Sequence, residues 1–465
     1  MTRERMSSVD HAWLRMDSPA NLMMIVGVWI FEAPMTREAL AQRLRERFLA
    51  FGRFRQRVST DEQGIWWVDD DSFDLDRHLV AERLADPGSE RQLQKRAADL
   101  AVRPLAPEHP LWQFHLVEDY RGASALITRI HHCIADGIAL VKVMLSMSDD
   151  GVAPAPRPRR RARSRAALPP MPPLDDLLSG GSRLVQDALS IALMNEDSRT
   201  RFKGPLGRRK ALAWNAPLPL ADVKAVCRAL GVSVNDVLLS CVAGALRRYL
   251  VDRGDDTAGI EIRAMVPVNL RAPDDPPDLG NRFGLVPLVL PVGIANPLAR
   301  LYEVRRRMGE LKGGFQAPLA YLLLAVLGQG PRALQGGVLD YLAGKSTAVM
   351  TNVPGPAEPI RILGNTVGRL MFWVPQSGPI GMGVSILSYR GGVQFGVMTD
   401  AGLCPQPQRI IDGFAPEFER LLLTLALLPP ELLTKGAPDP DELEHRLFGA
   451  AAAPAPLARR RPARR

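Results

Sequence analysis

The stretch SALITRIHHCIADGIALVKVMLSM, residues 124–147, decides how this sequence is interpreted. Its apolar start predicts a buried strand, and IALVKVMLSM at 138–147 predicts an apolar helix. Between them lies the heptapeptide His131-His132-Cys133-Ile134-Ala135-Asp136-Gly137, with the pattern HHxxxDG. The end of a strand that breaks into a turn is a usual place for catalytic side chains, because a rigid scaffold holds them there.

The chemistry of this heptapeptide is that of a general base. An imidazole with a pKa near 6.5 accepts a proton at neutral pH, and the aspartate four residues later could fix the ring or the loop. No G-x-S-x-G sequence supplies a serine nucleophile, and nothing marks Cys133 as a thiolate. A base without its own nucleophile favours direct attack by an acceptor on an activated acyl donor. The alternative is a structural or metal-binding role, although adjacent residues of a strand point to opposite faces and do not readily share one metal.

Both halves of the chain predict an α+β fold. In the first half, WQFHLVEDY (112–120) and residues 124–132 read as antiparallel strands joined at Arg121-Gly122. Further elements follow from the periodicity: a strand over 22–31, helices over 36–51, 91–102, 218–231, 233–254, 298–314 and 407–428, and strands in EIRAMVPVNL, LVPLVLPV, TAVMTNVPG, GVSILSYRGG and VQFGVMTDA. There is no regular βαβ alternation. The expected organisation is a first domain over 1–150, a linker over 151–173, a second domain over 174–447 and a disordered tail over 448–465.

The net charge of +9 comes from two arginine-rich segments. Residues 151–173 hold six arginines and residues 454–465 hold five, and neither segment contains an acidic residue. Neither segment has aromatic residues between its arginines or a recognisable nucleic-acid-binding motif, so nucleic acid is not expected as a partner. Arginine-rich segments are attracted to anionic membranes or lipid inclusions. A solvated tail that binds nothing is the alternative.

Cysteine usage and hydropathy predict a cytoplasmic protein, at most peripheral to a membrane or to lipid inclusions. The four cysteines are scattered and form no CxxC, which argues against a zinc or redox site, and we expect no metal and no cofactor. The first residues are charged and lack the apolar region of a secretory signal. The apolar stretches 22–31 and 317–328 are shorter than the ~20 residues of a membrane-spanning helix.

The pattern HHxxxDG resembles the active-site motif of the bacterial wax ester synthase/diacylglycerol acyltransferase family, within the CoA-dependent acyltransferases. Other landmarks of that family appear in the same order: Asp10 with Trp13, Phe73-Asp74 with His78, Pro110-Leu111-Trp112, Asn235-Asp236, VPVNLR at 266–271, Leu279-Gly280-Asn281, TNVPGP at 351–356, and Ser388-Tyr389 with Gly391. The resemblance covers roughly residues 5–430, and the two arginine-rich segments are departures from it.

The resemblance implies two domains like chloramphenicol acetyltransferase, with mixed sheets flanked by helices and an active-site channel between them. It implies an O-acyltransferase that uses acyl-CoA as a substrate and esterifies diacylglycerol or a long-chain alcohol. His132 would be the general base, with His131 and Asp136 in support and Gly137 permitting the turn. The alternatives are another alcohol or an amine as acceptor, or a non-catalytic protein of lipid-inclusion surfaces.

The remaining landmarks have structural interpretations beside the substrate-channel roles that the resemblance suggests. Pro110, Leu111 and Trp112 fit a core or a channel wall. Ser233-x-x-Asp236 fits a capping box, so Asn235 and Asp236 fit a helix start as well as a channel.

Overall fold

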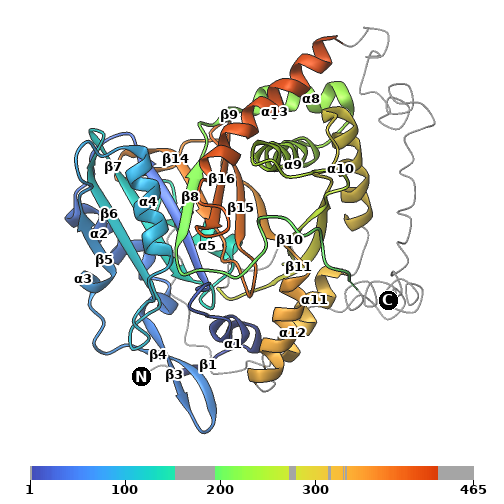
Figure 1. Cartoon of the computed structure of the whole chain (residues 1–465). Coiled ribbons are helices and arrows are strands. Elements are labelled where there is room, and N and C mark those ends of the chain that lie inside the picture. Colours follow the sequence, from blue (N-terminus) through green and yellow to red (C-terminus); the bar gives the residue numbers. More distant parts are fainter. Residues whose placement is uncertain are drawn as a thin grey trace.

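The computed structural model describes residues 3–151, 194–271, 279–312, 316–327, 329 and 332–427. The predicted linker beyond Gly151 and the predicted tail lie outside the described residues. Two large sheets, each flanked by helices, form the two halves of the molecule in Figure 1, and a three-stranded sheet lies at the lower edge. The predicted α+β fold is confirmed.

The six-stranded sheet of the first half has the order β13-β14-β2-β7-β6-β5. Its strands are β13 (Arg361–Ile362), β14 (Asn365–Trp373), β2 (Met24–Phe31), β7 (Ala123–His131), β6 (Trp112–Tyr120) and β5 (Leu79–Glu82). The predicted hairpin is present: β6 and β7 pair antiparallel, and Arg121 and Gly122 both have positive φ in its turn. The centre of this sheet carries residues 124–131 of the HHxxxDG region, so the motif begins in the core of the fold.

A strand from the second half completes this sheet. β14 pairs antiparallel with β2, with Met371 opposite Val28 and Trp373 opposite Val26. The sequence assigns these residues to the domain over 174–447, but alternate side chains of β14, including Val367, Met371 and Trp373, are buried. Met371 and Trp373 belong to an apolar cluster with residues of both halves. The boundary near residue 150 therefore does not coincide with the division between the sheets.

The second half contains a seven-stranded sheet with the order β11-β10-β12-β15-β16-β8, and β9 also pairs with β16. Its strands are β8 (Lys210–Trp214), β9 (Leu218–Pro219), β10 (Ile262–Asn269), β11 (Phe283–Leu290), β12 (Ala348–Pro354), β15 (Met382–Tyr389) and β16 (Gly392–Asp400). The helices α8 (Leu220–Leu230), α9 (Val234–Asp252), α10 (Pro297–Lys312) and α13 (Gln408–Leu427) form a layer beside it in Figure 1.

The remaining elements surround the first half or lie where the halves meet. They are α1 (Ser8–Arg15), α2 (Arg37–Arg43), α3 (Leu75–His78), α4 (Glu90–Ala101), α5 (Gly137–Ser146), α11 (Gln316–Leu327) and α12 (Arg332–Gly344), and the small sheet of β1 (Arg3–Arg5), β3 (Gln56–Asp61) and β4 (Gly64–Asp69). The helix predicted over 36–51 is divided, because a π-helical segment at Leu44–Phe48 follows α2. Within the described residues no single helix has the length and apolarity to cross a membrane; α8 and α9 pass that test only as a pair bent by 103°.

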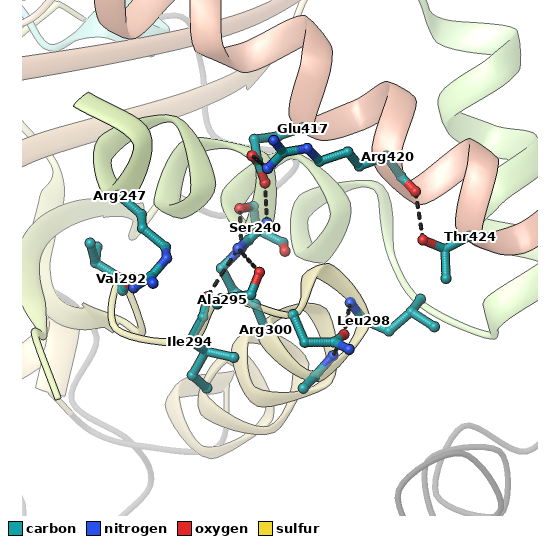
Figure 2. A network of polar contacts seen from close by, with 12 residues as sticks. Ser240, Arg247, Val292, Ile294, Ala295, Leu298, Arg300, Glu417, Arg420 and Thr424 are labelled. Carbon is teal, nitrogen blue, oxygen red and sulfur yellow. Dashed lines mark hydrogen bonds and ion pairs between the residues drawn. The ribbon is translucent and has the colours of Figure 1, made fainter. Parts of the chain in front are cut away.

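A buried ion pair holds the helical layer of the second half together (Figure 2). The Arg300 guanidinium on α10 donates to the Glu417 carboxylate on α13, and the two side chains are 1% and 3% exposed. Arg300 also donates to the carbonyl oxygen of Ser240 on α9, over 3.1 Å. A β-carbon at Gly244 would lie 2.2 Å from the Glu417 carboxylate, so only glycine fits beside this pair.

We predict that Glu417→Ala markedly lowers the thermal unfolding temperature. The change leaves the buried Arg300 without its carboxylate, and breaking a buried pair from one side costs about 3–5 kcal/mol. Glu310→Ala is the matched control, because Glu310 pairs with Arg306 on the surface and its side chain is 63% exposed. An exposed pair is worth about 0–1 kcal/mol. Equal unfolding temperatures for the two variants would contradict the prediction.

Candidate active site

His132 lies directly after β7, enclosed by aromatic rings from both halves. Its backbone N–H donates to the carbonyl oxygen of Met23 over 2.7 Å, which fixes the residue at the end of the central strand β7. Its ring stacks on Trp13 of α1, with centroids 4.3 Å apart and planes 20° apart, and lies 5.4 Å from the ring of Phe283 of β11. His132 is 3% exposed. The imidazole is thus held flat in an apolar environment where the two halves meet.

The enclosure keeps His132 neutral. Burial lowers its pKa to about 4, against a partial opposing effect of the Asp136 charge. Nδ1 of His132 is buried and has no hydrogen-bond partner among the described residues. A neutral imidazole has one ring nitrogen without a proton, and that nitrogen can accept one.

His131 points into a different environment. Its Nε2 lies 3.2 Å from Oδ1 of Asp17, and its Nδ1 accepts the backbone N–H of Cys133 over 3.1 Å. Nδ1 therefore faces the Cys133 N–H, and Nε2 faces the Asp17 carboxylate. Asp17 also accepts the Met23 N–H over 2.6 Å. His131 therefore fixes the backbone segment that carries His132.

Asp136 joins the two halves through its carboxylate. Oδ1 accepts the Ala139 N–H over 2.9 Å and caps α5. Oδ2 accepts a guanidinium N–H of Arg271, which follows β10, and the backbone N–H of Arg282 over 2.9 Å. The side chains of Asp136 and Arg271 are 6% and 5% exposed, so the ion pair is buried. Both carboxylate oxygens thus have partners other than the His132 ring.

Asn281 makes a second connection between the halves at the same place. Its side-chain amide donates to Oδ1 of Asp10 and to the carbonyl oxygen of His132, each over 2.8 Å. Burial raises the pKa of Asp10, while the hydrogen bonds from Asn281 and Ser7 lower it in part. Gly280 has a φ of 107°, a conformation that favours glycine, and its carbonyl oxygen accepts the Asp136 N–H over 3.3 Å. The backbone of His132 is therefore fixed by residues 149 positions further along the chain.

An apolar cavity adjoins the HHxxxDG loop. Its walls come from α5, β2 and β7 of the first half and from β14, β15 and the end of β12 of the second, and they include Gly137, Leu140, Met144, Trp29, Phe372 and Leu387.

Gly137 lies where the motif loop meets α5. It is the first residue of α5 and is absent from the positive-φ glycines, so the turn does not require glycine. Nothing lies within 4 Å of a β-carbon built there, and the residue lines the apolar cavity. The lack of a side chain leaves space beside the histidine loop.

Trp112, in the Pro110-Leu111-Trp112 landmark, is a core residue of the first half. Its indole N–H donates to the carbonyl oxygen of Phe54 over 2.8 Å, and its ring stacks on His78 at 4.5 Å. The carbonyl oxygen of Leu111 accepts the His131 N–H over 2.9 Å. The landmark thus holds the end of β7, which carries His131.

Asn235 and Asp236 open α9, in the second half. Ser233 and Asp236 form both hydrogen bonds of a capping box. Asn235 is exposed, and its side-chain oxygen accepts from Asn352 of β12 over 2.8 Å. These contacts secure a helix start and join it to the NVPGP strand, and none of them involves His132.

Two residues of this site carry no sequence signal that we recognised. Asp17 lies 114 positions from its partner His131, and Phe283 begins β11 two residues before the strand predicted from LVPLVLPV. Both are ordinary residue types outside a recognisable motif, so only the tertiary structure brings them together. In the described part of the chain, no group of three or more His, Cys, Asp or Glu side chains is arranged to hold a metal ion.

Two family models match this chain. The model of the wax ester synthase/diacylglycerol acyltransferase catalytic domain matches residues 6–185 and 176–238, and that of the WS/DGAT C-terminal domain matches residues 279–422. Probable diacylglycerol O-acyltransferase tgs1 of Mycobacterium tuberculosis H37Rv is 30% identical over 416 residues, which is 84% of this chain and 90% of the relative. Probable diacylglycerol O-acyltransferase tgs2 of the same strain is 29% identical over 439 residues, 86% of this chain and 95% of the relative.

Two solved structures share the fold. The wax ester synthase/diacylglycerol acyltransferase of Marinobacter aquaeolei VT8 matches with a TM-score of 0.68 at 22% identity, covering 91% of this chain and 100% of that one. The first condensation domain of the calcium-dependent antibiotic synthetase matches with a TM-score of 0.59 at 16% identity, covering 94% and 100%. Both likenesses concern the arrangement of the two halves.

Proposed function

Because this chain belongs to the wax ester synthase/diacylglycerol acyltransferase family, and is thus an O-acyltransferase, we propose that His132 is the general base of its reaction. The reaction transfers an acyl group from acyl-CoA to diacylglycerol or to a long-chain alcohol. The observation that carries the proposal is the neutral, buried His132 ring with an unpartnered Nδ1. Gly137 of the same motif lines an apolar cavity.

The proposed step needs no covalent enzyme intermediate. A ring nitrogen of His132 takes the hydroxyl proton of the acceptor as the hydroxyl oxygen attacks the thioester carbonyl. The new C–O bond forms, the C–S bond breaks, and the protonated imidazole returns its proton to the sulfur of the departing CoA. An alcohol is too weak an acid to ionise beforehand, so proton transfer accompanies the attack. His131 and Asp136 act as positioning residues, because their contacts fix the loop that carries the base.

The apolar cavity would hold a hydrocarbon chain of one substrate. Its lining comes almost entirely from apolar side chains, and it begins at Gly137, five residues after the base. Burying a methylene group stabilises a bound chain by about 0.8 kcal/mol. A chain in this cavity would bring its reacting carbonyl or hydroxyl to the histidine loop. The acceptor and donor are both lipids, and the arginine-rich segments would add attraction to an anionic lipid surface.

A product assay tests this function. The full chain would be incubated with labelled palmitoyl-CoA and, separately, with diacylglycerol, hexadecanol, a short alcohol and an aliphatic amine. We expect labelled triacylglycerol or wax ester, and little product from the short alcohol, since the cavity favours long chains. Amide as the main product would shift the function to the alternative acceptor. Binding of these lipids with no product from any acceptor would make the chain a non-catalytic lipid-surface protein.

We predict that the acidic limb of kcat/KM lies below pH 6.5, toward pH 4. Burial lowers the pKa of His132 to about 4, so the ring stays unprotonated until the pH falls well below the pKa of a free imidazole. Activity on a short, soluble alcohol would be measured from pH 4 to 8, with circular dichroism recording the fold at each pH. A limb at pH 6.5 or above in folded protein would contradict the buried neutral base.

A further inference from the structure

We propose that the indole N–H of Trp13 donates a hydrogen bond to the thioester oxygen on which negative charge develops during acyl transfer. The proposal deepens the proposed function and rests on it, because it concerns the same transfer at His132. When the acceptor oxygen attacks the thioester carbonyl, the C=O double bond becomes a C–O⁻ single bond. Donors fixed in advance at that oxygen usually make the largest single contribution to this kind of catalysis.

The side chain of Trp13 lies in the wall of the site, and its one polar atom is unused. Trp13 is 4% exposed, and its buried indole N–H has no hydrogen-bond partner among the described residues. A buried donor without a partner destabilises the folded protein, so such groups are uncommon and require an explanation. An indole N–H can only donate. A substrate oxygen that reaches this site would supply the missing acceptor.

The indole lies directly beside the base. Its ring stacks on the His132 imidazole, with centroids 4.3 Å apart and planes 20° apart. The intermediate carries the attacking oxygen and the oxyanion on one carbon, so a base for the first and a donor for the second have to lie side by side, as these two rings do. Phe283 lies 5.6 Å from the indole on β11. Apolar surroundings of this kind strengthen a hydrogen bond to a charged oxygen.

The neighbouring N–H groups are already used within the fold. The side-chain amide of Asn281 donates through both of its recorded hydrogen bonds to protein oxygens. Four backbone N–H groups of the HHxxxDG loop also donate to acceptors of the fold, namely those of His132, Cys133, Ile134 and Asp136. The loop backbone at these positions therefore offers no free donor to a substrate oxygen, in contrast to the indole of Trp13.

The donor and the base are held by the same side chain. Asp10 lies three residues before Trp13 on α1, and residues with this spacing share one face of a helix. Oδ1 of Asp10 accepts a hydrogen bond from the Asn281 amide, and the same amide donates to the carbonyl oxygen of His132, each over 2.8 Å. Asn281 thus fixes the helix that carries the donor and the backbone that carries the base. A donor fixed in this way needs no reorganisation during the reaction.

Replacing Trp13 with phenylalanine tests the donor, because the variant keeps an aromatic ring beside His132 and loses the N–H. We expect kcat with palmitoyl-CoA and hexadecanol to fall by about 10²–10³-fold, the usual loss on removing one such donor, with KM unchanged. Trp373→Phe is the matched control. Trp373 is 1% exposed and its indole N–H also has no partner in the described part of the chain, but its ring lies beside Trp214 in a different apolar cluster. The control should keep its turnover.

Three further measurements separate a donor from a structural role. Binding of a hexadecyl-CoA thioether, which has no carbonyl oxygen, should be equal for Trp13→Phe and the unaltered chain. The acidic limb of kcat/KM should also be the same in both, because the base is intact. Replacing Trp13 with benzothienylalanine keeps the size of the ring system and puts sulfur in place of the N–H. This variant should lose kcat as Trp13→Phe does.

Normal kcat in folded Trp13→Phe or in the benzothienylalanine variant overturns the proposal. An equal loss in Trp373→Phe also overturns it, as does a higher KM at unchanged kcat or a shifted acidic limb. The proposed base is tested separately. Normal turnover in His132→Ala with a loss in Trp13→Phe would refute the base and support the donor, whereas the reverse result would refute the donor alone.

Discussion

Replacing His132 with alanine should lower turnover by about 10²–10⁴-fold, the usual contribution of a general base. The variant loses the neutral imidazole that contacts the rings of Trp13 and Phe283. Initial rates of CoA release with diacylglycerol or hexadecanol would measure the loss. Thermal unfolding would establish that the variant is folded.

Two histidine variants serve as controls for His132→Ala. His131→Ala should have a smaller effect, because His131 acts through the backbone contacts of Cys133 and Asp17. His78→Gln changes a histidine that is also buried but stacks on Trp112 in the core, so it should alter stability more than chemistry. Near-normal turnover in a folded His132→Ala protein would refute the role of His132.

Replacing Asp136 with alanine should destabilise the protein by about 3–5 kcal/mol, with loss of activity as a consequence. The change removes the N-cap of α5, worth about 0.5–2 kcal/mol, and leaves the buried Arg271 guanidinium without its carboxylate. Asp136→Asn keeps an oxygen that can cap the helix but loses the charge, so its loss should be intermediate. Chemical denaturation monitored by tryptophan fluorescence would measure all three proteins.

A double-mutant cycle distinguishes the ion pair from a direct catalytic role. Arg271→Ala should cost about as much stability as Asp136→Ala, and the double variant should cost less than the two single losses combined. A fully stable Asp136→Ala protein with greatly reduced turnover would contradict the structural role and would point to an effect on the His132 ring.

The sequence predicts local elements well where the pattern is local. The hairpin of β6 and β7, the capping box at Ser233 and the glycine end of α8 all depend on residues within a few positions of one another. The division of the helix predicted over 36–51 is a different case, because a π-helical turn has no distinct apolar period. The pairing of β14 with β2 joins residues more than 300 positions apart, and nothing in either strand alone specifies the partner.

In the candidate site, too, the sequence predicts what depends on neighbouring residues and misses what depends on distant ones. The HHxxxDG motif identifies His132 because its spacing is contiguous, and the landmarks at Arg271 and Asn281 are visible as sequence. The sequence does not show that Arg271 binds Asp136 or that Asn281 binds Asp10, since a hydrogen bond between the two halves leaves no periodic pattern in the sequence. The open space beside Gly137 belongs to a cavity lined by residues distant in sequence, so the sequence alone does not reveal it.

The most direct test of the central claim, direct attack by the acceptor with His132 as base, is rapid-quench measurement of CoA release from labelled acyl-CoA. Without an acceptor we expect no burst of CoA and no label on the protein. With an acceptor, CoA and ester should appear together from the first turnover. A burst of CoA equal to the enzyme concentration, with the acyl label on Cys133 or another side chain, would contradict direct transfer.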